Sequence, residues 1–162
     1  MCGLTGSGKT TFAKRLEREE NAVRFSVDEW MIDLFGHHMP REVFDERLAT
    51  LRDLLWSAAR RLLELEVNVV LDFGFWKRAE RLDFHARARA AGAIPLLYFF
   101  DLPLSELRRR LEVRNERLEK GTFEVTPEML DVFSSRFEPP SETEELNLIR
   151  IGPERGVDEG KM

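Results

Sequence analysis

Apolar residues recur along the chain with two different periods, and these predict two kinds of element. From residue 41 to residue 66 the spacing is four, three, four, three and four residues, which predicts one long helix with a single buried stripe. That stripe comprises Phe44, Leu48, Leu51, Leu55, Ala58 and Leu62. Two other stretches, NVVLDFG at 68–74 and AIPLLYFFD at 93–101, are almost unbroken apolar runs, which is typical of strands buried on both faces.

The same reasoning predicts the remaining elements. Further helices are expected at 10–20, 77–91, 104 to about 118 and 127–137, and further strands at 24–27 and 146–151. Gly92 is suited to end the helix before it, because glycine readily adopts the left-handed conformation found after a helix. Thr126 is expected to cap the last helix, with Pro127 in its first position.

Strands that alternate with helices predict an α/β fold of three layers. We expect a mostly parallel sheet of about five strands covered by helices on both faces. The chain has no internal repeat or linker, so residues 1–151 are expected to form one domain, followed by a polar tail at 152–162. Ligands of such sheets bind beyond the carboxyl ends of the strands. Gly3, Asp28, Asp72 and Asp101 all lie at or just after such an end, which predicts several acidic groups at one crevice.

Composition and charge exclude several classes of protein. The 162 residues include 25 Lys plus Arg and 30 Asp plus Glu, so 25 − 30 gives a net charge of −5 and argues against a protein that coats DNA. The single cysteine, Cys2, excludes an internal disulfide and a multi-cysteine metal site. No run reaches the ~20 apolar residues of a membrane span, and the N-terminus does not resemble a secretion signal. We therefore expect a cytoplasmic protein without a membrane partner. The sequence predicts no oligomeric state.

Residues 3–10 carry the strongest chemical signal. They read GLTGSGKT and match the pattern G-x-x-x-x-G-K-[ST] in full. Glycines allow the backbone to curl around a polyphosphate so that successive N–H groups point inward, and the helix that follows adds its positive N-terminal end. Lys9 is then expected between the β- and γ-phosphates, with the Thr10 hydroxyl on Mg²⁺. The alternative is a Gly/Ser-rich turn before an unrelated helix, but the elements predicted downstream favour the phosphate loop.

The strand that should lead into this loop is very short. Only Met1 and Cys2 precede Gly3, whereas this strand is normally central in the sheet. Either the natural start lies upstream and Met1 belongs to this strand, or the central strand is truncated at the N-terminus, and we favour the first. Adding about five to eight native upstream residues, the length of an ordinary strand, is expected to raise the melting temperature markedly.

Among phosphate-loop proteins, the sequence favours a kinase. A GTP-dependent switch reads guanine with an N/T-K-x-D element, and this string does not occur. A motor ATPase usually follows its strand-terminal Asp with a Glu that polarises water, whereas Asp72 is followed by Phe73 and Gly74. A motor would also need a longer chain. A kinase needs a base near the acceptor hydroxyl, a Mg²⁺ shell and mobile cations.

Two aspartates and three arginines fit these needs. Asp28 follows the strand at 24–27, where it could accept a proton from an acceptor hydroxyl or, equally, cap the next helix. Asp72 could hold Mg²⁺ through water, with a loop-capping role as the alternative. On the helix at 104–118, Arg110, Arg114 and Arg117 border the buried leucine stripe, from where they could reach a transferring phosphoryl group.

These assignments leave some alternatives open. The three arginines could instead form a solvated face paired with Glu106, Glu112 and Glu116. Trp30 and Phe35 lie on the expected acceptor side, where they could line a pocket or simply pack.

Several segments together resemble the small bacterial P-loop kinases described as ATP-binding or AAA-family proteins. The relatives of this family include chloramphenicol phosphotransferase, zeta toxin, gluconate kinase and the kinase domain of phage polynucleotide kinase. The resemblance covers nearly the whole chain. It rests on GLTGSGKTT, SVDEW, VVLDFGFWKRAER, RRRLEVRNERL and GTFEVTPEMLDVFSSRFEPPSETEE.

The resemblance implies an ATP-dependent, Mg²⁺-dependent phosphotransferase and assigns roles to residues. Asp28 matches the base for the acceptor hydroxyl, and Lys9 and Thr10 match the phosphate and Mg²⁺ residues. Asp72 resembles the acidic residue in the LDG-type turn of nucleoside monophosphate kinases, and Arg78 or Arg81 resembles the acceptor-side arginines. Arg114 and Arg117 resemble arginines of a lid, expected over residues 110–126, and an acceptor-binding insert is expected over about 29–66. The nucleotide-binding set is Gly3, Thr5, Gly6, Ser7, Gly8, Lys9, Thr10, Thr11 and Arg110.

The acceptor is the least determined feature. The stretch 29–66 has no recognisable signature, and a small molecule with a hydroxyl group is the first choice. A 5′-hydroxyl polynucleotide kinase is the second, although Arg41, Arg47 and Arg52 are offset by nearby acidic residues in the sequence. A non-enzymatic ATP-binding regulator is the third.

Overall fold

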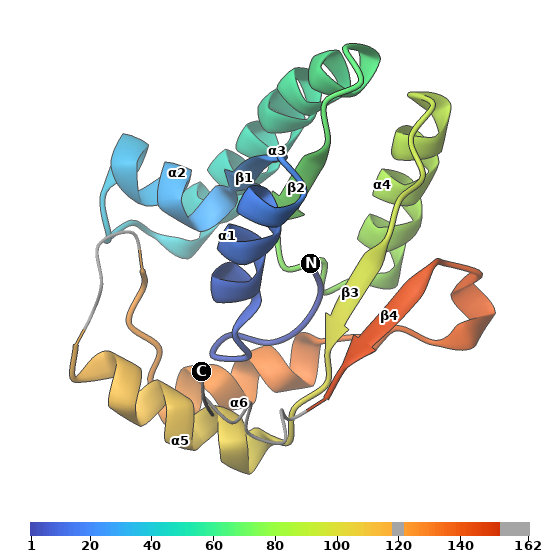
Figure 1. Ribbon diagram of the computed structural model, residues 1–162. Helices are drawn as coiled ribbons and strands as arrows, with labels where there is room; N and C mark the ends of the chain where they lie inside the picture. The colour runs from blue at the N-terminus through green and yellow to red at the C-terminus, as the bar shows by residue number, and fades with distance from the viewer. Residues whose placement is uncertain (118–121, 153–162) are drawn as a thin grey trace, which may run out of the picture.

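The computed structural model describes residues 1–117 and 122–152 as alternating helices and strands (Figure 1). The strands are β1 (Val23–Ser26), β2 (Val69–Asp72), β3 (Leu97–Phe100) and β4 (Leu148–Ile151). The α-helices are α1 (Lys9–Glu19), α2 (Val27–Phe35), α3 (Arg41–Glu64), α4 (Arg78–Ala90), α5 (Leu104–Asn115) and α6 (Pro127–Arg136), and a short 3₁₀ helix, η1, spans Glu142–Glu144. The α/β class and the order of the elements confirm the fold expected from the sequence.

The sheet consists of two parallel pairs joined through one residue. β1 pairs with β2, and β3 pairs with β4. Cys2 lies between the pairs and bridges to Gly74 after β2 and to Phe99 in β3. Its backbone N–H donates to Tyr98 (2.8 Å), and its carbonyl accepts from Phe100 (2.9 Å). The described residues therefore contain four strands. Met1, whose amino group donates to the Leu71 carbonyl at 3.0 Å, and Cys2 occupy the position of the expected central strand.

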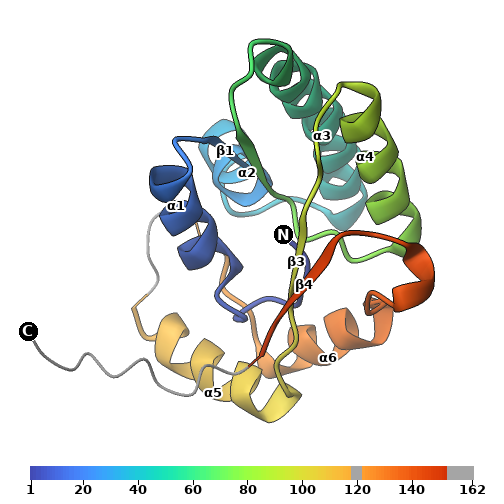
Figure 2. The ribbon, with the colours of Figure 1, turned by 45° about the vertical axis from the view of Figure 1, so that its right-hand side comes forward.

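Helices cover both faces of this sheet, as Figure 2 shows from the side. On one face, Leu51 and Leu55 of α3 and Phe84 of α4 pack against Phe25, Phe99 and the Cys2 side chain. On the other face, Ala13 of α1 packs against Val70 and Phe100. Because neighbouring residues of one strand contact opposite layers, β2 and β3 are buried on both faces, as their unbroken apolar runs predicted.

Most helix ends agree with the local signals, and one buried position differs. Gly92 (φ +81°) follows α4, and the Thr126 hydroxyl accepts a hydrogen bond from the Met129 N–H at the start of α6. In α3 the buried stripe passes through Ala59, and Ala58 is exposed, so the expectation for Ala58 was wrong. Alanines lie three and four residues after Leu55, at positions 58 and 59. Packing against the sheet buries Ala59 and leaves Ala58 exposed.

A third cluster joins the phosphate loop to the last two helices. Leu4 of the loop packs against Leu107 and Leu111 of α5, and Leu130 of α6 belongs to the same cluster. Figure 1 shows α5 and α6 lying beyond the carboxyl ends of β3 and β4. Of the lid expected over residues 110–126, positions 118–121 lie outside the described residues, as do residues 153–162 of the expected tail.

A cavity of about 610 Å³ lies at the other end of the sheet, near the amino ends of the strands. Its walls include Leu16, Trp56, Val69, Leu97 and Tyr98. Since ligands of parallel sheets bind at the carboxyl ends, this cavity is separate from the site described below. Among the helices that the structure describes, none has the length and apolar character required to cross a membrane.

Candidate functional site

The glycine loop adopts a conformation that only small residues allow. Gly3, Gly6 and Gly8 have φ values of +141°, +80° and +92°, in the region that favours glycine. A Cβ on Gly3 would stand 2.9 Å from the Phe100 carbonyl oxygen, and a Cβ on Gly6 would stand 2.9 Å from Leu111 Cγ. The loop is anchored by Trp76, whose indole N–H donates to the Gly3 carbonyl at 3.2 Å. The glycines at positions 3, 6 and 8 therefore allow the chain to form a tight loop directly before α1.

Lys9 begins α1 and turns back over the loop. Its ammonium group donates to the Leu4 carbonyl at 2.7 Å and to Ser7 Oγ at 3.4 Å. Desolvation lowers the pKa of Lys9, and the charges of Asp72 and Asp28 oppose this shift. The buried Ser7 lies in the loop itself, while Thr10 and Thr11 are exposed at the start of the helix, where their hydroxyl groups are accessible.

Asp28 lies at the same site, in the first turn of α2. The N-cap of α2 is Ser26, whose hydroxyl accepts a hydrogen bond from the Glu29 N–H at 3.5 Å, so a capping role for Asp28 is wrong. The Asp28 side chain is accessible to solvent but surrounded by protein atoms and charges. Desolvation raises its pKa first and the negative charge of Asp72 raises it further, whereas Lys9, Arg52 and Arg114 lower it.

Asp72 ends β2 and is almost completely buried. Its side chain is 4% exposed, and its Oδ2 atom has no hydrogen-bond partner. The nearest cation in an ion pair is Arg24, whose Nη1 lies 3.7 Å from that oxygen. Asp72 also lies close enough to Lys9 and Asp28 for its charge to act on both. The expected crevice is therefore correct for Asp28 and Asp72. It is wrong for Asp101, which pairs with Arg150 on the surface.

The three arginines of α5 occupy different environments. Arg114 donates to the Phe123 carbonyl at 3.0 Å and lies near Asp28, and desolvation lowers its pKa. Arg110 lies beside the phosphate loop, 3.8 Å from the point where a Gly8 Cβ would stand, and pairs with Glu106 at 2.7 Å. Arg117 is exposed in the turn after α5, and no interaction recorded in residues 1–117 and 122–152 connects its side chain to Lys9, Asp28 or Asp72.

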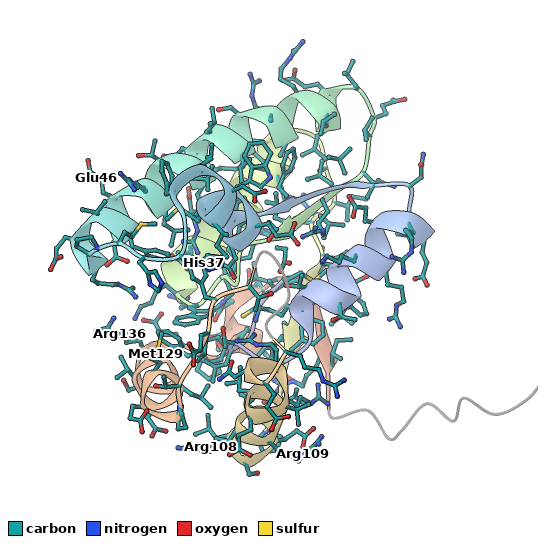
Figure 3. All side chains as sticks on the ribbon, turned by 90° about the vertical axis from the view of Figure 1, so that its left-hand side faces the viewer. His37, Glu46, Arg108, Arg109, Met129 and Arg136 are labelled. Atoms are coloured by element: carbon teal, nitrogen blue, oxygen red, sulfur yellow. The ribbon has the colours of Figure 1, made fainter. Side chains whose placement is uncertain are left out.

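The alternative of a solvated arginine face is therefore correct in part. Glu106 bonds to Arg109 and Arg110, and these hydrogen bonds lower the pKa of Glu106 to about 2. Figure 3 shows Arg108 and Arg109 on the outer side of α5, away from α2 and α3. Arg108 pairs with Asp131 of α6.

A group of aromatic side chains joins α3, the loop after α2 and the segment that follows residue 121. The ring of Phe123 lies 6.0 Å from those of His37 and Phe44. Figure 3 shows His37 between α3 and the layer of α5 and α6. Trp30 and Phe35 are both partly exposed, and the Phe35 ring contacts the Arg47 guanidinium. Trp30 and Phe35 are therefore not core residues.

Arg81 is the clearest departure from the roles expected from the sequence. It forms a two-bond ion pair with Glu144 (2.6 and 2.7 Å), with both side chains at most 1% exposed. It also donates to the carbonyls of Phe75 and Trp76. An acceptor-side role for Arg81 is wrong, because its donors bind protein groups 63 residues away in the sequence. Arg78, the other candidate, is exposed, and its backbone N–H donates to Glu138.

Two partly buried arginines at this site were missed as site residues. Arg52 of α3 pairs with Glu80 at 2.6 Å, donates to the Phe73 carbonyl at 2.9 Å and acts electrostatically on Asp28. Arg24 of β1 contacts Asp72. The sequence signal for Arg24 is a charged residue between Val23 and Phe25 in a short strand, which predicts a buried partner.

The fold and the loop together define a P-loop protein with a kinase-like architecture. The chain belongs to the AAA domain family, which it matches over residues 1–140. This confirms the resemblance to small P-loop proteins. A search of the curated proteins finds no match.

Two solved structures share the fold. The chain is similar to Kti12 of Chaetomium thermophilum, crystallised in complex with ADP-AlF3, with 18% identity and a TM-score of 0.69 over 99% of this chain and 89% of that one. It is also similar to a protein from Chloroflexus aurantiacus described as a "putative kinase", with 20% identity and a TM-score of 0.66 over 93% of this chain and 84% of that one. At these identities the likeness concerns the fold alone.

Proposed function

We propose that the protein is an ATP-dependent phosphotransferase that moves the γ-phosphate of Mg-ATP to a hydroxyl group of a small molecule. The observation that carries this proposal is the proximity of Lys9 and Asp28. Each lies close enough for its charge to change the pKa of the other, and the two come from separate elements, α1 and α2. A cation for the phosphates and a base for an alcohol are the two groups that phosphoryl transfer to an alcohol requires.

The chemistry of Asp28 fits a general base. Its raised pKa makes the carboxylate a stronger proton acceptor than an ordinary aspartate, and its exposed position leaves it open to an acceptor hydroxyl. The proton of the hydroxyl would move to Asp28 as the oxygen attacks the γ-phosphorus, and ADP would leave. Lys9 and Arg114 would lie near the oxygens on which charge is greatest.

The residues at the loop also fit Mg²⁺. The Asp72 Oδ2 atom is buried and without a hydrogen-bond partner, so it can accept from a metal-bound water, and the Thr10 hydroxyl is accessible at the start of α1. The described residues hold no cluster of three or more His, Cys, Asp or Glu side chains suited to a metal. That pattern agrees with an ion held mainly by substrate phosphates and water. When bound, Mg²⁺ supplies electrostatic stabilisation of the phosphate charge.

Arg110 and Arg114 support the nucleotide side of the proposal. Arg110 lies beside the glycine loop and Arg114 near Asp28, so α5 presents cations on two sides of the space expected for the triphosphate. The planar guanidinium groups suit phosphate oxygens. We keep Arg117 as a candidate lid residue next to positions 118–121.

A small acceptor is favoured over a polynucleotide. A groove that follows a nucleic-acid strand needs free cations in a row. On α3, Arg41 pairs with Asp45 at 2.9 Å and Arg52 pairs with Glu80 at 2.6 Å. The aromatic rings of His37, Phe44 and Phe123 beside this region suit a compact acceptor that contacts ring faces.

A transfer assay with labelled ATP tests the proposal. The acceptors would be nucleosides, sugars, aminoglycosides, phenicols and 5′-hydroxyl oligonucleotides. Asp28→Asn should abolish transfer while ATP binding persists, and Asp33→Asn, an exposed aspartate on the same helix, is the matched control and should leave transfer unchanged. Transfer that survives in Asp28→Asn would remove Asp28 as the base. ATP binding without transfer to any acceptor would favour the non-enzymatic regulator, and labelling of oligonucleotides alone would favour a polynucleotide kinase.

A further inference from the structure

Arg24 is a buried cation that the proposed reaction does not use. It lies in β1, and its side chain is 9% exposed. An arginine removed from water to this extent is costly unless carboxylates surround it. Its position in the strand places it on the face of the sheet that α1 covers, and its backbone N–H donates to Glu17 of α1 at 3.1 Å.

Three carboxylates from three different elements surround the guanidinium group. Nη2 donates to Glu29 of α2 at 2.6 Å, and Nε lies 3.5 Å from Glu17 of α1. Nη1 lies 3.7 Å from Oδ2 of Asp72, at the end of β2. One side chain therefore connects the helix after the phosphate loop, the helix that carries Asp28 and the strand that carries Asp72.

The contact with Asp72 is electrostatic and leaves the oxygen available. Neither Arg24 Nη1 nor Asp72 Oδ2 has a hydrogen-bond partner, although both atoms are buried. A distance of 3.7 Å is too long for a hydrogen bond but short enough for a strong charge interaction. Arg24 thus attracts the Asp72 carboxylate without occupying its lone pairs, so the oxygen can still accept from another donor.

The contact with Glu29 acts on the other side of the site. Glu29 directly follows Asp28, and its N–H is the donor to the Ser26 cap of α2. A bond of 2.6 Å from Arg24 to the Glu29 carboxylate fixes this first turn. The position of Asp28 depends on the same turn.

We propose that Arg24 is a positioning residue that holds Asp72 and the first turn of α2 in fixed relation, so that the metal-side carboxylate and the proposed base face one bound nucleotide. This inference rests on the proposed function. It assigns to β1 a role in the reaction site that the phosphate loop alone does not supply.

The test is the Mg²⁺ dependence of ATP binding, measured by calorimetry with and without Mg²⁺ for the wild type, Arg24→Met, Asp72→Asn and the double variant. Arg24→Met should reduce the gain in ATP affinity due to Mg²⁺ roughly tenfold, about as much as Asp72→Asn, and the double variant should lose little more. Arg24→Lys should restore part of the gain. Glu17→Gln is the matched control, since it removes only the negative charge that α1 places beside Arg24, and should keep the wild-type gain.

Two results would overturn the inference: equal weakening of ATP binding with and without Mg²⁺ in Arg24→Met, or losses that add fully in the double variant. A crystal structure of Arg24→Met is a readout that needs no nucleotide. It should show the Asp72 carboxylate or the first turn of α2 displaced, and an unchanged position of both would also overturn the inference. Failure of the wild type to transfer phosphate would count against the proposed function and not against Arg24.

Discussion

At the scale of single residues, the site contains side chains whose charged forms are less stable in the folded protein than in water. The pKa of Asp28 is raised and that of Lys9 is lowered, mainly by desolvation in each case. Both shifts mean that the charged form is less favourable in the folded protein than in the unfolded chain. Groups of this kind are common at reaction sites, where stability is given up for reactivity.

Asp28→Asn should therefore stabilise the protein at neutral pH. A carboxyl group whose folded pKa lies above its ordinary value of 3.8 binds its proton more tightly when folded, so ionised Asp28 destabilises the fold above that pKa. The gain should stay below about 1 kcal/mol because the side chain is accessible to solvent. Urea unfolding at pH 7 and at about pH 3 checks this, because the difference should vanish at the lower pH. A loss of stability at pH 7 would contradict it.

Gly6→Ala should disrupt the contact between the phosphate loop and α5. The new Cβ would stand 2.9 Å from Leu111 Cγ on a backbone with φ +80°. Gly36→Ala is the matched control, since Gly36 has φ +78° and nothing within 4 Å. We expect about 1 kcal/mol for the backbone strain in Gly36→Ala and about 1–3 kcal/mol more in Gly6→Ala, measured by urea unfolding. Equal losses in the two variants would show that Leu111 moves aside freely.

At the scale of elements, the buried ion pair of Arg81 and Glu144 joins α4 to η1. Arg81 also holds the carbonyls of Phe75 and Trp76, and Trp76 bonds to the phosphate loop. The pair therefore connects the C-terminal part of the chain to Gly3 through one intermediate residue.

Arg81→Met should cost about 3–5 kcal/mol, because it leaves the Glu144 carboxylate buried without its partner. The double variant Arg81→Met, Glu144→Leu should recover part of this loss. Lys77→Met removes the nearby exposed pair with Glu138 and should change stability by less than about 1 kcal/mol. Chemical denaturation of the four proteins measures these differences. A cost of less than about 1 kcal/mol for Arg81→Met would show that the pair contributes little.

The elements that the sequence predicts well are those with local signals. The cap at Thr126, the glycine at 92 and the apolar runs of β2 and β3 each act within a few residues, so the elements they mark follow from the sequence. The loop at 3–10 is local as well. Its proximity to Asp28 and Asp72 follows from the rule that the carboxyl ends of parallel strands meet.

The features that the sequence does not reveal depend on distant partners. In the sequence, Arg81 is one of several arginines of an amphipathic helix, and nothing local indicates its ion pair. Its partner, Glu144, lies 63 residues away. The capping role in α2 falls to Ser26 instead of Asp28 because β1 ends one residue earlier than expected. Asp101 follows a strand like Asp72 does, yet its side chain is exposed and pairs with Arg150 of the neighbouring strand β4.

At the scale of the whole molecule, the two strand pairs meet at one residue. Cys2 supplies the backbone bridges between them, and burial raises the pKa of its thiol to about 11, so the thiol stays protonated and donates to the Phe75 carbonyl. The cavity near the amino ends of β2 and β3 lies along the same junction.

Native-state hydrogen exchange in low denaturant should therefore separate the two strand pairs. The backbone amides of β1 and β2 should exchange through one local unfolding step, and those of β3 and β4 through another. The two unfolding steps should have different free energies. Few hydrogen bonds cross between the pairs, so one pair can open while the other stays formed. A single free energy shared by all four strands would show that the helices make the sheet cooperative despite the narrow junction.

This junction also bears on how the reaction site would respond to a ligand. Asp28 and Asp72 follow β1 and β2, whereas Arg110 and Arg114 follow β3, so the acidic and basic sides of the site belong to different strand pairs. Bending at Cys2 would change the distance between those sides. A triphosphate that touches both would restrict this bending, and the rigidity of the entire sheet would then vary with nucleotide concentration.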